Sequence, residues 1–256
     1  MNNIFEIMPQ EVPENDSQRR KGKLRPLSAE VSCLKRADGS AKFSSGSTQV
    51  LAAVFGPASP RVPSRERSND AIISVVFKHG TKASSADNTN NALSGYGATE
   101  RELERFIGDA LVACVAVNKY PRTVIEVVIQ VIKSDGSLLS TALNAATLAM
   151  MDAGVEMNSL PIGTTCLVKA NTDNVDDMRF DPCADDESVE DCSVIVLATD
   201  SVREGVIASM TLGPFQLSSF LSSVEGASRA SKAVLAFMRI AIEQKVTREA
   251  QTLWSM

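Results

Sequence analysis

The chain has 256 residues, of which 44% are hydrophobic and 22% are charged, and its formal net charge at pH 7 is -5. This composition suffices for one or two domains with a full core, and the acidic balance argues against a free-standing binder of duplex nucleic acid. No apolar run reaches about 18 residues, and Asn2, Asn3 and Glu6 interrupt the N-terminal segment, so we expect neither a membrane span nor a secretory signal but an intracellular protein.

Metal and cofactor chemistry has little support in the sequence. The five cysteines are scattered and form no CxxC pair, which is typical of reduced thiols inside a cell. His79 is the only histidine, so histidine-rich metal sites are excluded and a Ser-His-Asp triad would have to be built around that residue. We therefore expect no metal and no cofactor.

The N-terminal third predicts an arm followed by a meander of strands. Residues 1–24 hold few large apolar side chains and end in a basic cluster, which predicts a mobile arm. The folded part is expected to begin near Arg25, with strands at 28–36, 40–44 and 48–55 separated by turns at Asp38-Gly39 and Gly46-Ser47. A loop rich in Pro, Ser and Arg (57–70) then precedes a strand at 71–78.

The middle of the chain predicts two helices around one central strand. A polar stretch (82–98) leads to an amphipathic helix with Leu103, Phe106 and Ile107 on its apolar stripe. Residues 123–133 are apolar and β-branched on both faces, as expected of a strand covered on two sides. A helix from about 137 to 153 follows and is closed by Gly154; it is apolar nearly all round and should be buried.

The C-terminal part predicts short strands and one long helix. The strands fall near 164–170, 176–180, 192–199 and 203–212, and the helix runs from about 216 to 247. The predicted core stripe of that helix consists of Leu217, Phe220, Leu221, Val224, Val234, Phe237 and Met238. The order of elements predicts an α+β domain of mixed sheets with flanking helices over 25–248, followed by a short tail at 249–256.

Three stretches resemble the RNase PH fold, which is ribosomal protein S5 domain 2-like and occurs in bacterial phosphorolytic exoribonuclease, in polynucleotide phosphorylase and in the ring of the exosome. They are "RADGSAKFSSGSTQVLAAVFGP" (36–57), "YPRTVIEVVIQVIKSDGSLLSTALNAATLAMMDAG" (120–154) and "RFDPCADDESVEDCSVIVLATD" (179–200). Their order matches the family, and the details are most similar to one ring subunit of the eukaryotic exosome.

The resemblance implies a phosphate site that has been lost. Active relatives follow the turn at Gly136 and Ser137 with a Thr or Ser and then an Arg, whose hydroxyl and guanidinium hold the attacking phosphate. Leu138 and Leu139 occupy those positions here and supply neither charge nor donor, while a helix N-terminus alone offers about half an elementary charge. Loss of phosphorolysis is the expectation.

The resemblance also marks remnants of a catalytic pair. Asp181 and Glu187 fall at the spacing of the family's two carboxylates, one of which is proposed to protonate the leaving 3′ oxygen. The alternative is that 173–191 is a solvated acidic loop. Without a phosphate site, Asp181 and Glu187 are remnants of the catalytic pair and are not assigned a catalytic role.

RNA contacts are expected from two groups of basic residues. Arg61, Arg65, Arg67 and Lys78 come from the part of the fold whose loops line the RNA path in the resembled ring. Active archaeal-type subunits also carry two arginines just before the first long helix, where this chain has Ala98 and Thr99. Arg101 and Arg105 lie one turn further on; they either meet RNA or belong to a solvated helix face.

The leading functional hypothesis is a non-catalytic ring subunit of the RNA exosome, which scaffolds the ring and guides single-stranded RNA in 3′-to-5′ processing, including that of ribosomal RNA. The resemblance implies other RNase PH-like subunits and cap subunits as partners, and a location in the nucleus, nucleolus and cytoplasm. One alternative is a homodimer in isolation that cleaves RNA or DNA by phosphorolysis or by metal-assisted hydrolysis. Another is a fold that serves only as a protein-binding module.

Overall fold

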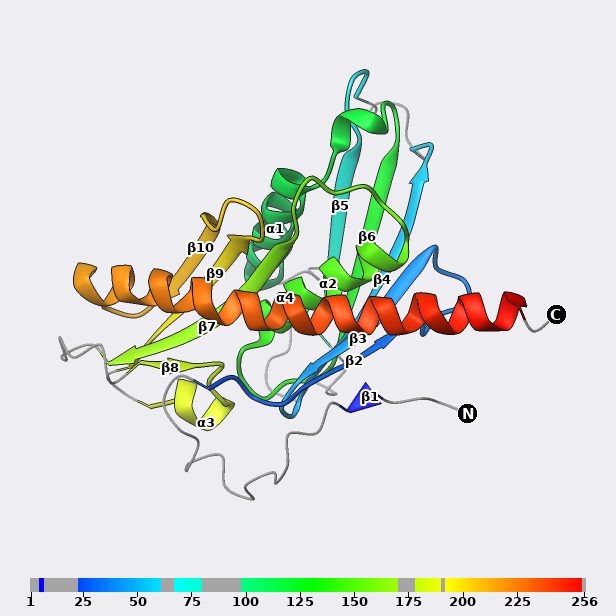
Figure 1. The fold of residues 1–256 in the computed structure, drawn as a ribbon. Helices are drawn as coiled ribbons and strands as arrows, with labels where there is room; N and C mark the ends of the chain where they lie inside the picture. Colours follow the sequence, from blue (N-terminus) through cyan, green and yellow to red (C-terminus); the bar gives the residue numbers. More distant parts are fainter. Residues whose placement is uncertain are drawn as a thin grey trace, which may run out of the picture.

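The computed structural model describes residues 5–6, 23–60, 67–79, 98–169, 178–189 and 192–254. Most of the predicted N-terminal arm, together with Arg61 and Arg65, lies outside these ranges. The described elements form two β-sheets, with one helix between them and others around them (Figure 1). The predicted α+β class with mixed sheets is confirmed.

The larger sheet contains the predicted meander. Its strand order is β1 (Phe5–Glu6), β2 (Leu27–Val31), β3 (Gly39–Ser45), β4 (Thr48–Ala58), β6 (Val124–Lys133) and β5 (Ile72–Lys78). All neighbours are antiparallel except β5 and β6, which are parallel. β2 ends earlier than predicted, because the chain turns over residues 32–38 rather than at Asp38-Gly39 alone. One face of β6 is fully buried and the other only half-buried.

The smaller sheet is antiparallel throughout, in the order β10 (Val206–Leu212), β9 (Cys192–Asp200), β7 (Pro161–Lys169) and β8 (Arg179–Phe180). Helix α2 (Leu138–Asp152) packs against β3 and β4 of the larger sheet and against β7 of the smaller one, so it is buried on nearly every side, as predicted. It ends at the predicted position, where Gly154 adopts a φ of +68° that favours glycine.

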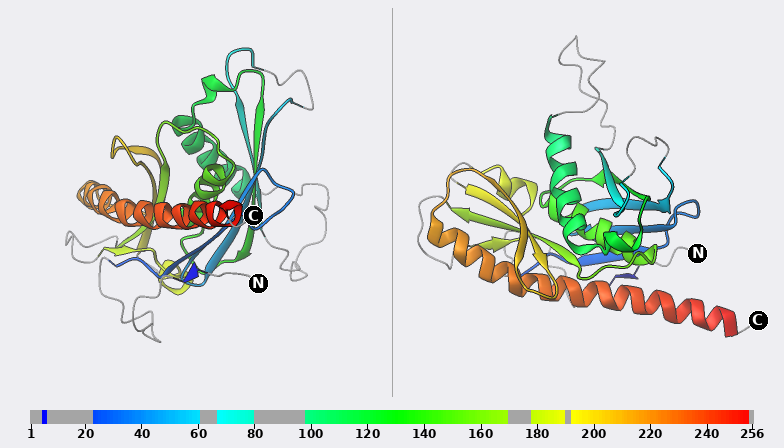
Figure 2. Two further views of the ribbon diagram at one scale, coloured as in Figure 1. Left: turned by 45° about the vertical axis from the view of Figure 1, so that its right-hand side comes forward. Right: turned by 90° about the horizontal axis from the view of Figure 1, so that it is seen from above.

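The remaining helices lie on the outside. Helix α1 (Ala98–Cys114) packs against β5 and β10, and a short 3₁₀ turn, η3 (Val117–Lys119), follows it. The single turn α3 (Ala184–Glu187) precedes β9. Helix α4 (Leu217–Trp254) contacts β2, β7 and β9 and crosses both sheets (Figures 1 and 2). Among the described residues, none of the helices combines the length and apolar character needed to cross a membrane.

Helix α4 corrects two features of the sequence prediction. It extends to Trp254, so residues 249–254 continue the helix. Two of its predicted core residues, Leu217 and Leu221, are 72% and 57% exposed. In these first turns the buried side of α4 carries the small residues Ser219, Ser223 and Ala227. The ring of Phe180 lies so close to the helix that a Cβ added at Gly226 would approach it to 2.3 Å.

Candidate functional site

The turn before α2 is fixed from two directions. The hydroxyl of Thr48 donates to the carbonyl oxygen of Gly136 at 2.7 Å and accepts the N–H of Asp135 at 3.0 Å. Gly136 has a φ of +74°, and a Cβ added there would lie 2.4 Å from the carbonyl oxygen of Pro182. Glycine is therefore required both by the conformation and by the contact with the segment that precedes α3.

The start of α2 already holds a carboxylate from the same chain. The N–H of Ser137 donates to Oε1 of Glu187 at 2.8 Å, and the Ser137 hydroxyl donates to the carbonyl oxygen of Pro182 at 2.9 Å. An anion at a helix N-terminus is stabilised by the free N–H groups and by the helix dipole. Glu187 thus occupies the kind of position in which a phosphate oxygen would accept a hydrogen bond.

Neither leucine after the turn is a surface feature. Leu139 is 5% exposed and belongs to the main hydrophobic cluster, and the half-buried Leu138 packs against the same cluster. Their side chains stabilise the packing of α2 between the sheets. They offer no donor to a ligand.

Asp181 is buried and bound on both carboxylate oxygens. Its Oδ1 accepts from Nη2 of Arg25 at 3.1 Å, and its Oδ2 accepts from the hydroxyl of Ser45. Its N–H donates to the carbonyl oxygen of Thr165 at 2.8 Å, and its φ is +57°. Asp181 is only 6% exposed, so the prediction of a wholly solvated acidic loop is wrong at this residue.

Arg25 is the central cation of the site and was not identified from the sequence. Its Nη1 donates to the carbonyl oxygen of Asp135 at 2.7 Å, and its Nη2 donates to that of Gly136 at 3.2 Å as well as to Asp181. The residue is 2% exposed. It therefore joins the first residues of the folded chain to the turn before α2 and to the acidic segment.

Glu187 is electrostatically coupled to the same group. Burial raises the pKa of its carboxyl above the ordinary value, and the neighbouring Asp181 and Asp135 raise it further. The hydrogen bond from Ser137 and the charge of Arg25 act in the opposite direction but do not cancel the rise. The structure thus brings Asp181 and Glu187 into one cluster with Arg25 and Asp135.

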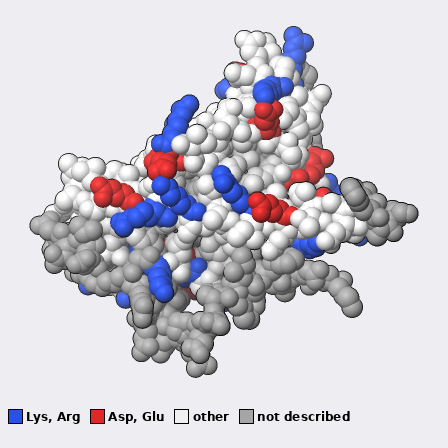
Figure 3. Space-filling view, in the orientation of Figure 1, with Lys and Arg blue, Asp and Glu red and all other residues white. Residues whose placement is uncertain are grey.

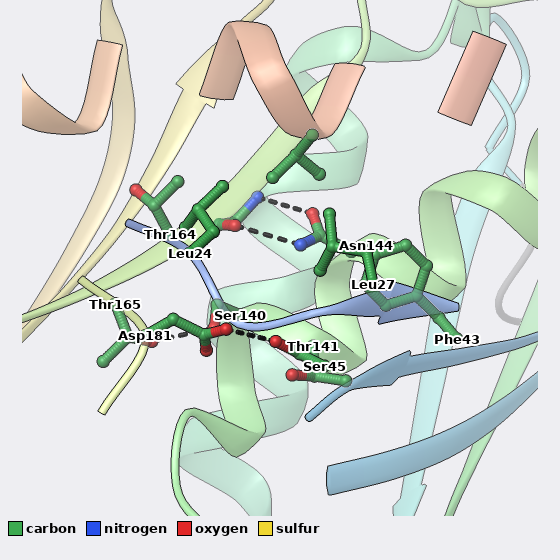
Figure 4. A pocket seen from close by; sticks show the side chains of 12 residues that line it. Leu24, Leu27, Phe43, Ser45, Ser140, Thr141, Asn144, Thr164, Thr165 and Asp181 are labelled. Atoms are coloured by element: carbon green, nitrogen blue, oxygen red, sulfur yellow. Dashed lines mark hydrogen bonds between the residues drawn. The ribbon is translucent and has the colours of Figure 1, made fainter. Parts of the chain in front are cut away.

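A small cavity lies beside this cluster, between α2 and β7 (Figure 4). Its polar wall carries Ser140, Thr141 and Asn144 of α2 and Thr164 and Thr165 of β7, with Ser45 and Asp181 at the other end. The volume is about 20 Å³, which accommodates one water molecule and excludes a nucleotide. The cavity is therefore a feature of the packing and not a substrate pocket.

Those of the predicted RNA-contacting residues that the structure describes lie at the two ends of β5. At the C-terminal end of β5, Lys78 is exposed. Helix α1 is bound to the same end, because Glu104 accepts the N–H of Phe77 at 2.8 Å. Arg101 and Arg105 are exposed on α1 close to Glu104. Arg67 precedes the start of β5, where its carbonyl oxygen accepts the N–H of Arg122. At about 3.3 Å per residue, the strand separates the two groups by roughly 20 Å.

In the described part of the chain, no three His, Cys, Asp or Glu residues come close enough together to hold a metal ion. All five cysteines are free thiols.

Two further arginines form ion pairs within the chain. Arg105 forms an exposed pair with Asp109 at 3.7 Å, and Arg179 pairs with Asp186 at 2.7 Å. Arg179, like Arg25, is therefore already paired with a carboxylate of the acidic segment.

Comparison with known proteins identifies relatives along the whole fold. The chain is 28% identical over 251 residues to the exosome complex exonuclease RRP46 homolog of Arabidopsis thaliana, covering 92% of this chain and 98% of that protein. It is 33% identical over 144 residues to the RRP41 homolog of the same plant, covering 56% and 58%. The crystal structure of rice (Oryza sativa) Rrp46 superposes with a TM-score of 0.73 and 30% identity, covering 88% and 98%.

A more distant neighbour shares the fold alone: the Archaeoglobus fulgidus exosome with RNA bound to the active site gives a TM-score of 0.70 at 21% identity, covering 88% of this chain and 92% of that chain. The profile of the 3′ exoribonuclease family, domain 1 (RNase_PH), matches residues 23–156. This match covers the meander, β6 and α2, which are the elements that carry the turn at Gly136. The chain belongs to the 3′ exoribonuclease family and has the RNase PH fold.

Proposed function

We propose that this chain is a non-catalytic ring subunit of the RNA exosome core, where it helps to build the ring and to guide single-stranded RNA toward a nuclease elsewhere. Membership of a ring is supported by the similarity to RRP46 and RRP41 homologs and to solved exosome cores. The observation that carries the non-catalytic part is the hydrogen bond from Ser137 at the start of α2 to the chain's own Glu187.

Phosphorolysis requires a phosphate dianion to bind beside an RNA phosphodiester, and fixed positive charge must hold it. Here the N–H at the helix start is used by Glu187, and the guanidinium of Arg25 is used by Asp181 and by two carbonyl groups. Three carboxylates, Asp135, Asp181 and Glu187, surround that one cation. When ionised, they leave the cluster net negative, which repels phosphate.

The proposed RNA contacts are the basic residues at both ends of β5, together with Arg61 and Arg65. The proposed partners are other RNase PH-like exosome subunits, which form the ring, and cap subunits, which cover it. We place the protein in the nucleus, nucleolus and cytoplasm, as an RNA-processing complex that acts on ribosomal RNA would require. Imaging of a fluorescently tagged chain tests this location.

The decisive experiment follows degradation of a 3′-tailed single-stranded RNA by the purified chain, with and without phosphate and with and without magnesium. Asp181→Asn and Glu187→Gln serve as controls for the two carboxylates. We expect no degradation that depends on either residue. Phosphate-dependent loss of RNA that disappears in both variants would overturn the proposal.

Reconstitution tests the scaffold role separately. The chain is mixed with other RNase PH-like exosome subunits, and the mass of the assembly is measured with and without it. We expect rings only when the chain is present. The alternative, a metal-dependent nuclease, predicts magnesium-dependent cleavage in the first experiment, and no contact among the described residues favours it.

A further inference from the structure

The middle of α4 carries positive charge without acidic neighbours along the helix. Residues 226–242 contain Arg229, Lys232 and Arg239 and no Asp or Glu, although the whole chain has a formal net charge of -5. All three cations are exposed, and Figure 3 shows Lys and Arg side chains gathered over the middle of α4. This part of the surface therefore has the opposite charge from the molecule as a whole.

The three cations have few partners within the chain. Lys232 pairs with Glu204 at 2.9 Å, but both side chains are more than half exposed, and an exposed pair of this kind is weak. Among the residues that the structure describes, none forms an ion pair with Arg229 or Arg239. Their charge is therefore available to another molecule.

Exposed apolar residues run along α4 beside these cations. Ala233, Ala236 and Ile240 have the spacing of a and d positions in a coiled coil, and Lys232 and Arg239 then occupy two successive g positions. All five are exposed, Ile240 by 41%. We define the α4 outer face as Arg229, Lys232, Ala233, Ala236, Arg239 and Ile240.

The body of the protein holds this face in a fixed orientation. Val234 and Met238 lie on the opposite side of α4, are 2% and 0% exposed, and belong to the main hydrophobic cluster. In the right-hand view of Figure 2, α4 runs along the edge of the molecule. With two alanines at its centre, the face lets a second helix approach closely, because the distance between packed helices depends on the side chains at the contact.

We infer that the α4 outer face binds an acidic amphipathic helix of a partner protein. Apolar side chains of that helix pack on the two alanines and Ile240, and carboxylates seven residues apart pair with Lys232 and Arg239, which are about 10 Å apart along the axis. Two copies of this face would instead bring like charges together. The inference goes beyond the proposed function, because the partner is recognised by its charge and helical pattern and not by an RNase PH fold.

Single-stranded RNA fits this face less well than an acidic helix does. Proteins hold such RNA with positive charge and also with aromatic side chains on which the bases stack. Phe237 is the only aromatic residue of 226–242, and its half-buried ring packs on that of Phe43 with centroids 5.9 Å apart. Residues 226–242 thus offer cations and apolar surface but no ring for stacking.

The test is binding of a labelled helical peptide to the purified full chain, measured by fluorescence anisotropy. The peptide has about three heptads, with Leu at a and d and Glu at e and g. Lys232→Glu with Arg239→Glu should weaken binding about tenfold, because attractive pairs become repulsive. Binding to wild type should also weaken as salt is raised. A peptide with Lys in place of Glu should bind the double variant more tightly than the wild-type chain.

Matched variants separate the face from the charge of the whole chain. Lys35→Glu with Arg36→Glu makes the same change in net charge at exposed residues between β2 and β3, and it should leave binding unchanged. Ala236→Gln enlarges the centre of the face without adding charge and should weaken binding by preventing close approach. Circular dichroism melting should be similar for all these variants, since the changed residues are exposed.

The inference fails if the wild-type chain does not bind the acidic peptide, or if Lys232→Glu with Arg239→Glu binds it as wild type does. It also fails if single-stranded poly(U) RNA displaces the peptide and binds this face more tightly. Reconstitution keeps the outcomes distinct from ring membership. A double variant that still enters rings with other RNase PH-like subunits supports a separate partner, whereas one that is excluded from rings assigns the face to a ring neighbour and overturns the inference.

Discussion

Nη2 of Arg25 lies 3.1 Å from Oδ1 of Asp181, and both residues are buried although 156 positions separate them in the sequence. Removing one member of a buried ion pair leaves an uncompensated charge, at a cost of about 3–5 kcal/mol. Arg25→Met should therefore lower the free energy of unfolding by about that amount in urea titration.

The second member of the pair provides the control. In Arg25→Met the carboxylate of Asp181 is left without its cation. Adding Asp181→Asn removes that unpaired charge, and Asn tolerates the positive φ at this position, so the double variant should recover part of the lost free energy of unfolding. Arg36→Met, at an exposed arginine, should change stability by less than about 0.5 kcal/mol. If Arg25→Met were as mild as Arg36→Met, the pair would be irrelevant to stability.

The raised pKa of Glu187 predicts a dependence of stability on pH. In the folded state the pKa of Glu187 lies above the ordinary value of 4.5. Its carboxyl therefore contributes fully to stability at pH values below 4.5, and this contribution is lost as the pH rises through the folded-state pKa. Glu187→Gln keeps an oxygen for the Ser137 N–H and cannot ionise. The variant should be more stable than wild type at pH 7, and the difference should close at pH 4.

The measurement is chemical unfolding of both proteins from pH 4 to pH 7. Glu225→Gln, at an exposed position of α4, controls for the removal of one negative charge. A difference between wild type and Glu187→Gln that stays constant across the range would contradict the raised pKa.

Restoring the family residues after the turn should not restore phosphorolysis. Leu138→Thr with Leu139→Arg places a guanidinium where a 5% exposed leucine packs in the core, and an unpaired buried charge is strongly destabilising. The double variant should melt at a lower temperature and remain inactive. Val246→Arg, at an exposed position, controls for the added charge. Phosphate-dependent RNA loss in the double variant would refute the prediction.

Asp152 should anchor the second half of α4. Its carboxylate accepts from the Ser32 hydroxyl at 2.7 Å, from the N–H of Ser40 at 2.8 Å and from the ammonium group of Lys245. Burial lowers the pKa of Lys245, but its contact with Asp152 outweighs this and raises the pKa above the ordinary value. Asp152→Asn should cost about 3 kcal/mol and increase hydrogen exchange in the helix near Lys245.

Glu249→Gln is the matched control for that experiment. Glu249 also pairs with Lys245, at 3.5 Å, but its side chain is 61% exposed. An exposed pair contributes less than about 1 kcal/mol, so this variant should exchange like wild type. Equal effects of the two substitutions would show that Asp152 has no special role.

RNA contacts at the two ends of β5 should be energetically independent. Lys78→Ala and Arg67→Ala change residues separated by roughly 20 Å, beyond the range over which substitutions usually couple. In a reconstituted ring, their effects on the free energy of RNA binding should add. Each lost phosphate contact should also reduce the slope of log K against log salt by about 0.7. A strongly non-additive pair would indicate one shared contact.

The sequence predicts local features of the fold well and the site only in part. Hydrophobic periodicity and turn residues located most strands, the buried α2 and its end at Gly154. The exposure of Leu217 and Leu221 was missed, because the orientation of α4 depends on the ring of Phe180, which is distant in sequence. The role of Arg25 could not be predicted for the same reason, because its partners Asp135, Gly136 and Asp181 are distant in sequence and meet it only in the folded chain.

Helix α4 also sets the order in which this protein can fold. Val234 and Met238 complete the larger hydrophobic cluster, and Ala227 completes the smaller one, yet all three lie in the last of the described elements. Contacts between residues so far apart in sequence form slowly, since a long loop must close first. During synthesis, both cores therefore keep an uncovered apolar face until α4 has left the ribosome, and apolar surface exposed in this way favours aggregation.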